Sequence, residues 1–482
     1  MRKNMAPAKD IIVDPEINSV TIDIAFEQWR AQLPRFSRLL RYYMGDQDFG
    51  DTHKDQNQIV ANHCAYITDV LVGYQFGNEP RYTTDDADVI GQNILDLMKA
   101  QDKWAVDQEI AEDMSIFGKT FELVYLPQGK NEPNSVELDP LHAFVAYSGD
   151  IEKDSVFGAV VYSYTTNDRQ EMFRIYLYDT QKVSIWETKA QDSAPRTWSM
   201  IEGPTPHGFG RVPLIEYKNN RKAIGDYEDI MDLQDAYNGL LSDRQDNQDS
   251  FAQAMLTLSG GQIIGTTTEE INEGRRTLKE MKVLQLDEDV VAQYLVKPSN
   301  ETDCEVLQSR ISDDLHKLAM VPNLADEQFS GNASGVAMAY KLFGTDQIIA
   351  RKQSMMQKGF TRRCKLYDYR INNPAMSPNY EPKADIDHMV ITFNLNAPQD
   401  LAYIASAVVQ LTTAKVLSLQ TARTLVSAIS DPEQETELVK QETEEEAQRT
   451  KETFDPDATD DRNRMLRQQE EEPNDGEISP DE

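Results

Sequence analysis

The sequence has few of the residues that build disulfide frameworks and metal centres. Its 482 residues include three cysteines, Cys64, Cys304 and Cys364, and six histidines. The cysteines lie far apart, without the CxxC spacing of a zinc site or a redox motif. The histidines are equally scattered and no HExxH motif occurs. We therefore expect a reducing environment, no metal and no other cofactor.

Long apolar runs are missing as well. The apolar stretch at residues 401–414 contains Gln410 and several threonines and is followed by Lys415, whereas a membrane span needs about 20 mostly apolar residues. We expect no association with a membrane. At about 150 residues per domain, the length predicts roughly three compact units.

Positive charge is in short supply. The chain has 48 Lys and Arg against 82 Asp and Glu, a net charge of -34, which argues against a protein that clamps nucleic acid by neutralising phosphates. Residues 431–482 alone contain 20 acidic and 6 basic side chains. Apolar periodicity ends near Lys451, so residues 451–482 are predicted to form a solvated, disordered tail. A tail that binds a partner is the alternative.

Motifs of catalysis are absent. The GKT triplet at residues 118–120 lacks the upstream glycine of a phosphate-binding loop, because Asp113 stands there. The helical pattern also precedes the strand pattern at this point, the reverse of that loop's context. Glu109, Glu112 and Asp113 have the spacing of a helix surface, and carboxylates that hold a metal are the alternative. We expect a protein that is not an enzyme, and a metal-dependent nuclease is the less favoured reading.

The apolar pattern changes from helix to strand and back. Residues 26–99 are helical apart from a polar link, with a helical stripe that starts at Ile59. Residues 119–220 alternate like β-strands, with DTQK at 179–182 as a hairpin turn. Helices return at 225–258, 301–321 and 335–371, the last with Gly344 and Gly359 as bend points. A strand near residue 391 and two or three helices follow. The pattern predicts an α+β fold around a meandering antiparallel sheet.

The predicted helix at residues 225–258 has a polar middle. Residues 242–250 (SDRQDNQDS) contain no apolar side chain, so this stretch must run beside solvent or a water-filled space. Asp243, Asp246 and Asp249 fall three residues apart, near one helix face. An ordinary solvated face and a functional acidic face are equally compatible with this spacing.

Two groups of basic residues stand out in so acidic a chain. Arg275, Arg276, Lys279 and Lys282 follow the acids Glu269, Glu270 and Glu273, an order that suits the dipole of a short helix. The predicted long helix carries a larger set: Arg351, Lys352, Lys358, Arg362, Arg363 and Lys365. Pairing with carboxylates of another subunit explains this set at least as well as contact with DNA.

Several segments, taken in order, resemble the portal proteins of long-tailed double-stranded DNA bacteriophages, the ring-shaped head-to-tail connectors. The resemblance rests on YYMGD at residues 42–46, on residues 57–82, and most strongly on 212–260. It recurs in SGNASGVAMAYK at 330–341 and ITFNLNAPQD at 391–400. It spans roughly residues 40–450, and another phage structural protein or an intracellular scaffold protein is the main alternative.

The resemblance implies a division of the chain that the pattern alone does not name. It implies an N-terminal arm (1–25), a wing (26–224), a first stem helix (225–258), a clip (259–300) and a second stem helix (301–321). A tunnel loop (322–334), a long wing helix with a strand (335–396), a crown (397–450) and the acidic tail (451–482) complete it. The subunits would form a ring, of twelve by family expectation, with the stem around a central channel.

The resemblance also implies sites and partners. Candidate channel-lining residues are Asp243, Asp246 and Asp249, and candidate tunnel-loop residues are Asp326, Glu327, Gln328, Phe329, Ser330, Asn332 and Ser334. Candidate contacts with DNA or a neighbouring subunit are Arg351, Lys352, Lys358, Arg362 and Arg363. Candidate clip contacts are Glu273, Arg275, Arg276 and Lys279. The implied partners are double-stranded DNA without sequence specificity, the terminase, capsid and scaffold proteins and a head-completion adaptor. The implied location is the capsid vertex of the virion, after assembly in the host cytoplasm.

Overall fold

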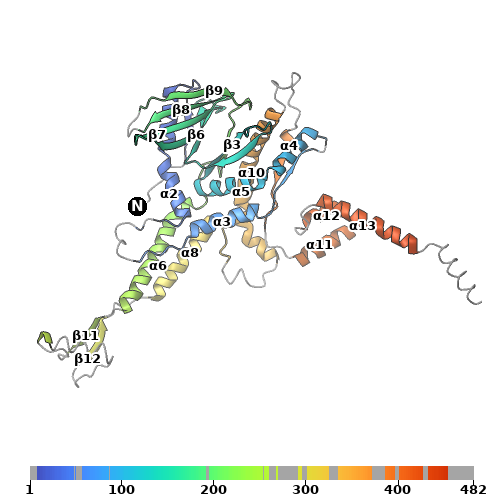
Figure 1. The fold of residues 1–482 in the computed structure, drawn as a ribbon. Helices are drawn as coiled ribbons and strands as arrows, with labels where there is room; N and C mark the ends of the chain where they lie inside the picture. The colour runs from blue at the N-terminus through green and yellow to red at the C-terminus, as the bar shows by residue number, and fades with distance from the viewer. Residues whose placement is uncertain are drawn as a thin grey trace, which may run out of the picture. The chain divides into compact units, whose positions relative to one another are not determined.

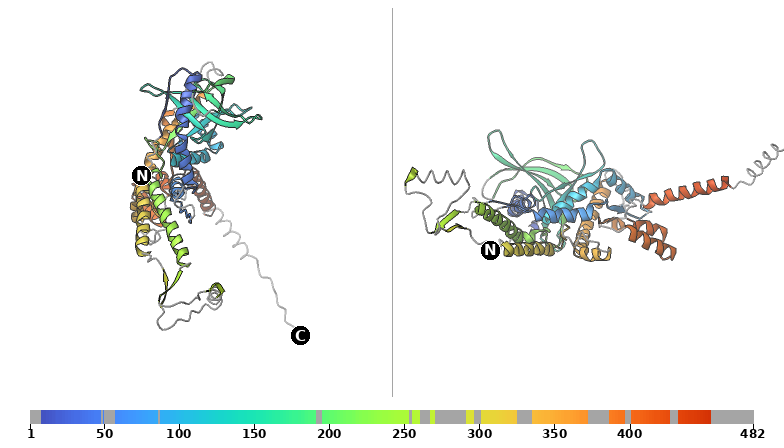
Figure 2. Two further views of the ribbon diagram at one scale, coloured as in Figure 1. Left: turned by 90° about the vertical axis from the view of Figure 1, so that its left-hand side faces the viewer. Right: turned by 90° about the horizontal axis from the view of Figure 1, so that it is seen from below.

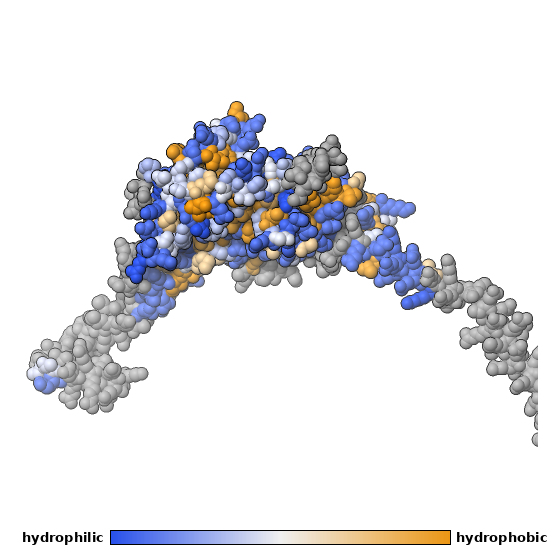
Figure 3. All heavy atoms as spheres, turned by 45° about the horizontal axis from the view of Figure 1, so that its top comes forward, coloured by the Kyte–Doolittle hydropathy of each residue, from blue (hydrophilic) through white to orange (hydrophobic). Residues whose placement is uncertain are grey.

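A computed structural model describes thirteen parts of the chain: residues 8–47, 49, 57–85, 87–190, 195–252, 255–259, 267–269, 291–295, 301–324, 335–371, 386–396, 401–426 and 432–453. The chain divides into two compact units. The first comprises residues up to 333 and 338–397, and the second comprises 334–337 and 398–482. Within the described residues, no helix is long and apolar enough to cross a membrane. The face drawn in Figure 3 is largely hydrophilic, with apolar patches between the polar side chains.

The predicted meander is confirmed as a six-stranded sheet in the order β1-β5-β6-β7-β8-β9 (Figure 1). Its strands are β1 (Ile11–Val13), β5 (Ala143–Ser148), β6 (Ser155–Thr165), β7 (Glu171–Tyr178), β8 (Lys182–Lys189) and β9 (Ser199–Pro206). The hairpin turn predicted at residues 179–182 joins β7 to β8. All neighbouring strands are antiparallel except β1 and β5.

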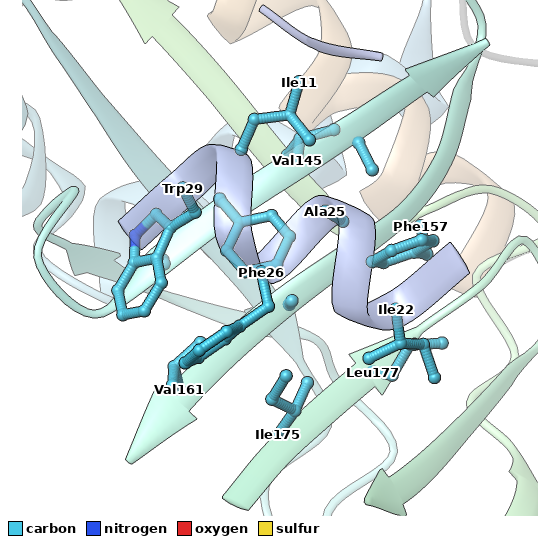
Figure 4. Packing of buried hydrophobic residues seen from close by; sticks show 14 of the residues in the cluster. Ile11, Ile22, Ala25, Phe26, Trp29, Val145, Phe157, Val161, Ile175 and Leu177 are labelled. Carbon is cyan, nitrogen blue, oxygen red and sulfur yellow. The ribbon is translucent and has the colours of Figure 1, made fainter. Parts of the chain in front are cut away.

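Helix α1 (Ser19–Arg30) covers one face of this sheet. The side chain of Asn18 caps the helix by accepting from the N–H groups of Val20 and Thr21. Figure 4 shows Phe26 of α1 among side chains of the sheet, and Phe26 is fully buried. The described part of the expected N-terminal arm is therefore built into this layer through β1 and α1, because Ile11 and Ile22 belong to its core.

A second core lies where a three-stranded sheet meets helices from both ends of the first unit. The sheet has the order β10-β3-β4, formed by Leu214–Lys218, Lys119–Tyr125 and Asn134–Leu138. The helices are α3 (His63–Phe76), α4 (Val89–Ala100), α5 (Lys103–Phe117) and α10 (Gly335–Ile371), and the pair β2 (Arg81–Thr83) and β13 (Val390–Thr392) closes the core. The predicted end of the long helix at Ile371 is confirmed.

The two glycines expected to bend α10 lie within one continuous helix. A Cβ atom on Gly359 would lie 2.0 Å from the ring of Tyr217, so the glycine allows β10 to approach the helix closely. Gly118 serves another purpose at the end of α5, where its φ of 82° reverses the chain into β3.

Helices α6 (Met231–Ala252) and α8 (Glu301–Ala319) pack side by side (Figures 1 and 2). The short helix η2 (Glu228–Ile230) precedes α6, and a third core joins this region to α2 (Leu33–Tyr43), α3 and α10. The prediction of helix through Leu258 is wrong. Residues Met255–Ser259 form strand β11, which pairs antiparallel with β12 (Val291–Leu295). The short apolar run of Met255, Leu256 and Leu258 is compatible with a strand as well as with a helix.

The second unit contains helices α11 (Leu401–Thr413), α12 (Leu419–Leu425) and α13 (Pro432–Thr453). Ser418 caps α12 by accepting from the N–H of Thr421. These are the helices expected after the strand near residue 391. Most of the expected tail, from residue 454 onward, lies outside the described residues.

Candidate functional site

The polar face of α6 binds the segment that leads into α3, residues 57–63, whose last residue begins that helix; we call this segment the strap. The backbone N–H groups of Ile59 and Ala61 donate to the side-chain oxygens of Ser242 (3.0 Å) and Asn238 (3.0 Å). The same pattern continues toward both ends of the strap, with Gln234 accepting from the N–H of His63 at 3.2 Å. At the other end, Asp246 accepts from the N–H of Asn57 at 3.0 Å.

The repeat distances explain why this ladder fits. Four residues of α-helix rise about 6 Å, and two residues of an extended strand rise about 6.6 Å. Gln234, Asn238, Ser242 and Asp246 are four residues apart, and the N–H groups they bind are two residues apart. A row of polar side chains on α6 therefore substitutes for a partner strand. The prediction of a helical stripe beginning at Ile59 is wrong, because α3 begins at His63.

The three candidate channel aspartates occupy different surroundings. Asp246 and Asp249 each accept a hydrogen bond of 2.8 Å from the side-chain amide of Asn57. Asp243 is exposed. Two of the three carboxylates therefore bind the strap, and, among the described residues, Asp243 makes no hydrogen bond to it.

The candidate basic residues of α10 divide into buried and exposed groups. Arg363 is fully buried and pairs with Asp107 of α5 at 2.5 Å and with Glu122 of β3 at 2.7 Å. Lys352 is buried against Asp226, and Arg362 contacts Ser155. Arg351 and Lys358 are exposed. Three of the five candidates therefore hold the first unit together, and two remain at its surface.

The electrostatics of the Arg363 cluster favour the ion pair. Burial opposes the charged form, yet the adjacent carboxylates of Asp107 and Glu122 outweigh it, and the pKa of Arg363 lies well above its usual value. The hydroxyl of Tyr217 donates to Glu122 at 2.8 Å. A buried charge with this many partners is costly to disrupt.

Two histidines meet where α3, α6 and α8 come together. The rings of His63 and His316 lie 5.5 Å apart, and His63 packs edge-on against Tyr237 at 4.9 Å. Burial lowers the pKa of both histidines. The hydroxyl of Tyr66 donates to the carbonyl of Pro322 at 3.0 Å and accepts from the N–H of Leu324 at 2.9 Å. Tyr66 therefore fixes the chain just after α8.

Other candidates from the sequence are outside the described residues. These are the tunnel-loop set (Asp326, Glu327, Gln328, Phe329, Ser330, Asn332 and Ser334) and the clip set (Glu273, Arg275, Arg276 and Lys279). Within the described ranges, no group of three or more His, Cys, Asp or Glu side chains is arranged to hold a metal ion.

Sequence reasoning missed the strap and its polar ladder. A signal was present, because Gln234, Asn238, Ser242 and Asp246 repeat at four-residue spacing on one helix face. That spacing indicates a continuous polar row but does not say which segment binds to it.

Comparisons with known proteins identify the class. A sequence model described as phage portal protein, SPP1 Gp6-like, matches residues 22–449, which is most of the chain. The protein is a phage portal protein. Within that class, it belongs to the SPP1 Gp6-like family.

A curated relative and two solved structures are also similar to the chain. The portal protein of Bacillus phage SPP1 is 24% identical over 426 residues, which cover 86% of this chain and 82% of the relative. The neck of a native GTA particle, computed with C12 symmetry, is similar with a TM-score of 0.47 and 11% identity, covering 81% of this chain and 93% of that one. The neck of an empty GTA particle, computed with C6 symmetry, gives a TM-score of 0.47 at 12% identity, over 81% and 93% of the two chains.

Proposed function

We propose that this portal protein assembles into a ring of twelve subunits whose central channel passes double-stranded DNA during packaging and ejection. The observation that carries the proposal is the family match over residues 22–449. The antiparallel α6 and α8 would form the stem, and β11 and β12, which lie between them in sequence, would belong to the clip. The first-unit sheets with α10 would form the wing, and α11 to α13 the crown.

The charge of the chain suits a channel through which DNA slides. DNA presents one negative charge per about 1.7 Å of helix axis, and the chain has a net charge of -34. A surface that repels phosphates does not trap DNA. Asp243 and Asp249, both exposed on α6, are the described candidates for such a surface. Asp246 contributes less, because it is partly buried.

We assign the remaining partners by the same reasoning. The clip, with Glu273, Arg275, Arg276 and Lys279, would dock the terminase and later the head-completion adaptor. Residues 322–334 would form the tunnel loop nearest the DNA, and Tyr66 would hold its first residues in place. Capsid and scaffold proteins would surround the wing and crown at one vertex of a particle assembled in the host cytoplasm. The portal itself would act without catalysis, and the terminase would supply ATP hydrolysis.

The test is the native mass of the purified full-length protein, with negative-stain images of the same sample. Twelve copies of the 54.8 kDa chain amount to about 658 kDa. We expect a particle near this mass with an open central hole. A protein that stays monomeric or dimeric over a wide concentration range, even with capsid and scaffold proteins present, would contradict the proposal.

A further inference from the structure

One face of α10 is exposed along most of the helix. Tyr340 and Phe343, near its start, are 80% and 62% exposed. Arg351, Lys358 and Lys365 follow at seven-residue intervals and are all exposed. Seven residues make nearly two complete turns of helix, so these three cations line up along one face. We call these five residues the outer face of α10.

The cations of this outer face lack carboxylate partners in the described part of the chain. Two buried cations of α10 near them do have carboxylate partners: Lys352 pairs with Asp226, and Arg363 pairs with Asp107 and Glu122. Three unpaired cations in one row are unusual for a chain with a net charge of -34. Exposed aromatic side chains next to them are typical of a protein interface.

A complementary acidic surface lies on α5 and α3. Glu109 is exposed, and the hydroxyl of Tyr43 lies 3.1 Å from both Glu112 and Asp69. Burial, and then the carboxylates of Glu112 and Asp69, raise the pKa of Tyr43. These three carboxylates form no ion pair with a cation among the described residues. We call Asp69, Glu109 and Glu112 the acidic face.

The two faces point away from one shared core. Helices α5 and α10 cross in Figure 1 and are joined inside by Asp107 and Arg363. On α5, Glu109 and Glu112 lie about 200° and 140° around the helix from Asp107. On α10, Lys358 and Lys365 lie about 140° and 200° from Arg363. Each helix therefore turns its buried face toward the other and its charged face outward, on opposite sides of the pair.

We propose that the outer face of α10 docks onto the acidic face of the next copy of this chain. A contact between two different surfaces of identical subunits is heterologous, and such contacts form a ring when the rotation from one subunit to the next closes. The acceptor is another copy because the surfaces are complementary in charge and lie on opposite sides of one subunit. DNA is the weaker occupant, since Tyr340 and Phe343 add apolar area that phosphates do not satisfy. This inference rests on the proposed ring and names the surfaces that form it.

The experiment measures the native mass of full-length variants over a concentration series, with circular dichroism to verify folding. We expect Phe343→Glu and Lys358→Glu each to raise the concentration needed for assembly by about tenfold or more, with an unchanged spectrum. Ile151→Glu and Lys189→Glu are the matched controls, because Ile151 is exposed in the loop between β5 and β6 and Lys189 is exposed on β8. Both controls should assemble like the original protein.

Charge reversal on the opposite face tests the pairing directly. Glu109→Lys alone should weaken assembly, and Glu109→Lys combined with Lys358→Glu should restore at least part of it. Rings that form normally with Phe343→Glu and Lys358→Glu overturn this inference and leave the ring function standing. Weaker DNA retention in such normal rings would assign the face to DNA instead. If the original protein forms no ring at all, the proposed function itself fails.

Discussion

The strap ladder predicts that Asn238 controls how firmly residues 57–63 are held on α6. Asn238 is 1% exposed, accepts from the N–H of Ala61 at 3.0 Å and from the side chain of Gln234 at 2.9 Å, and donates to the side-chain oxygen of Gln47. In Asn238→Ala, the N–H of Ala61 and the oxygen of Gln47 lose their partners. An unsatisfied polar group costs about 1–3 kcal/mol when buried. Since both groups are only partly buried, we expect the strap to open about 2 kcal/mol more easily.

Hydrogen exchange followed by mass spectrometry measures this opening in the full-length assembled protein. A change of 2 kcal/mol corresponds to exchange about 30-fold faster in a peptide that covers residues 57–66. Asn247→Ala is the control, because Asn247 is an exposed amide on the same helix. The Asn247→Ala variant gains as much helix propensity as Asn238→Ala does, and, in the described part of the chain, Asn247 makes no hydrogen bond to the strap. Equal exchange in the two variants would show that the ladder does not hold the strap.

Three further predictions concern buried charges and histidines. Burial and the nearby carboxylates of Asp139 and Glu109 raise the pKa of Glu137 to about 7. The contribution of Glu137 to the free energy of unfolding is therefore full below about pH 4.5 and is lost as the pH rises through 7. We expect Glu137→Gln to flatten the dependence of the melting temperature on pH between pH 5 and 8. Arg363→Met should lower the free energy of unfolding, measured by urea titration, by about 3–5 kcal/mol, because it leaves two carboxylates buried without a cation. Adding Asp107→Asn to this variant should restore part of the lost free energy of unfolding. Burial lowers the pKa of His316 and of His63, so their contribution is lost as pH falls below about 6.5. Exchange at residues 320–324, divided by the intrinsic exchange rate at each pH, should therefore rise on acidification, and His316→Gln should remove most of that rise.

The elements that the sequence predicts well are those with one dominant local signal. The end of α10 at Ile371 and the hairpin at residues 179–182 follow from helical periodicity and turn composition. The strap was not predictable in this way, since Ile59 also fits a helical stripe. Its extended form depends on side chains of α6 about 180 residues away, and local pattern carries no information about them.

The candidate basic residues show the same limit. Sequence spacing places Lys352, Lys358 and Arg363 on one helix but cannot tell which of them meet acids from other elements. Lys352 is buried because Asp226 lies beside it. Arg363 is buried because Asp107 and Glu122, from two other segments, lie beside it. Lys358, five residues from Arg363, lies on the opposite side of the helix. Which cations remain for a partner is thus decided by tertiary packing.

These internal pairs also bear on the proposed passage of DNA. Arg35 pairs with Glu228, Lys119 with Glu216, and Lys352 with Asp226, each pair buried. Because such pairs are close to neutral, they remove cations from the surface and leave nearly all of the net negative charge outside. Surface charges act on DNA over a Debye length of about 8–10 Å. Under the proposed function, a chain that buries part of its cations in internal pairs would therefore present DNA with a mainly repulsive surface, which would favour passage over binding.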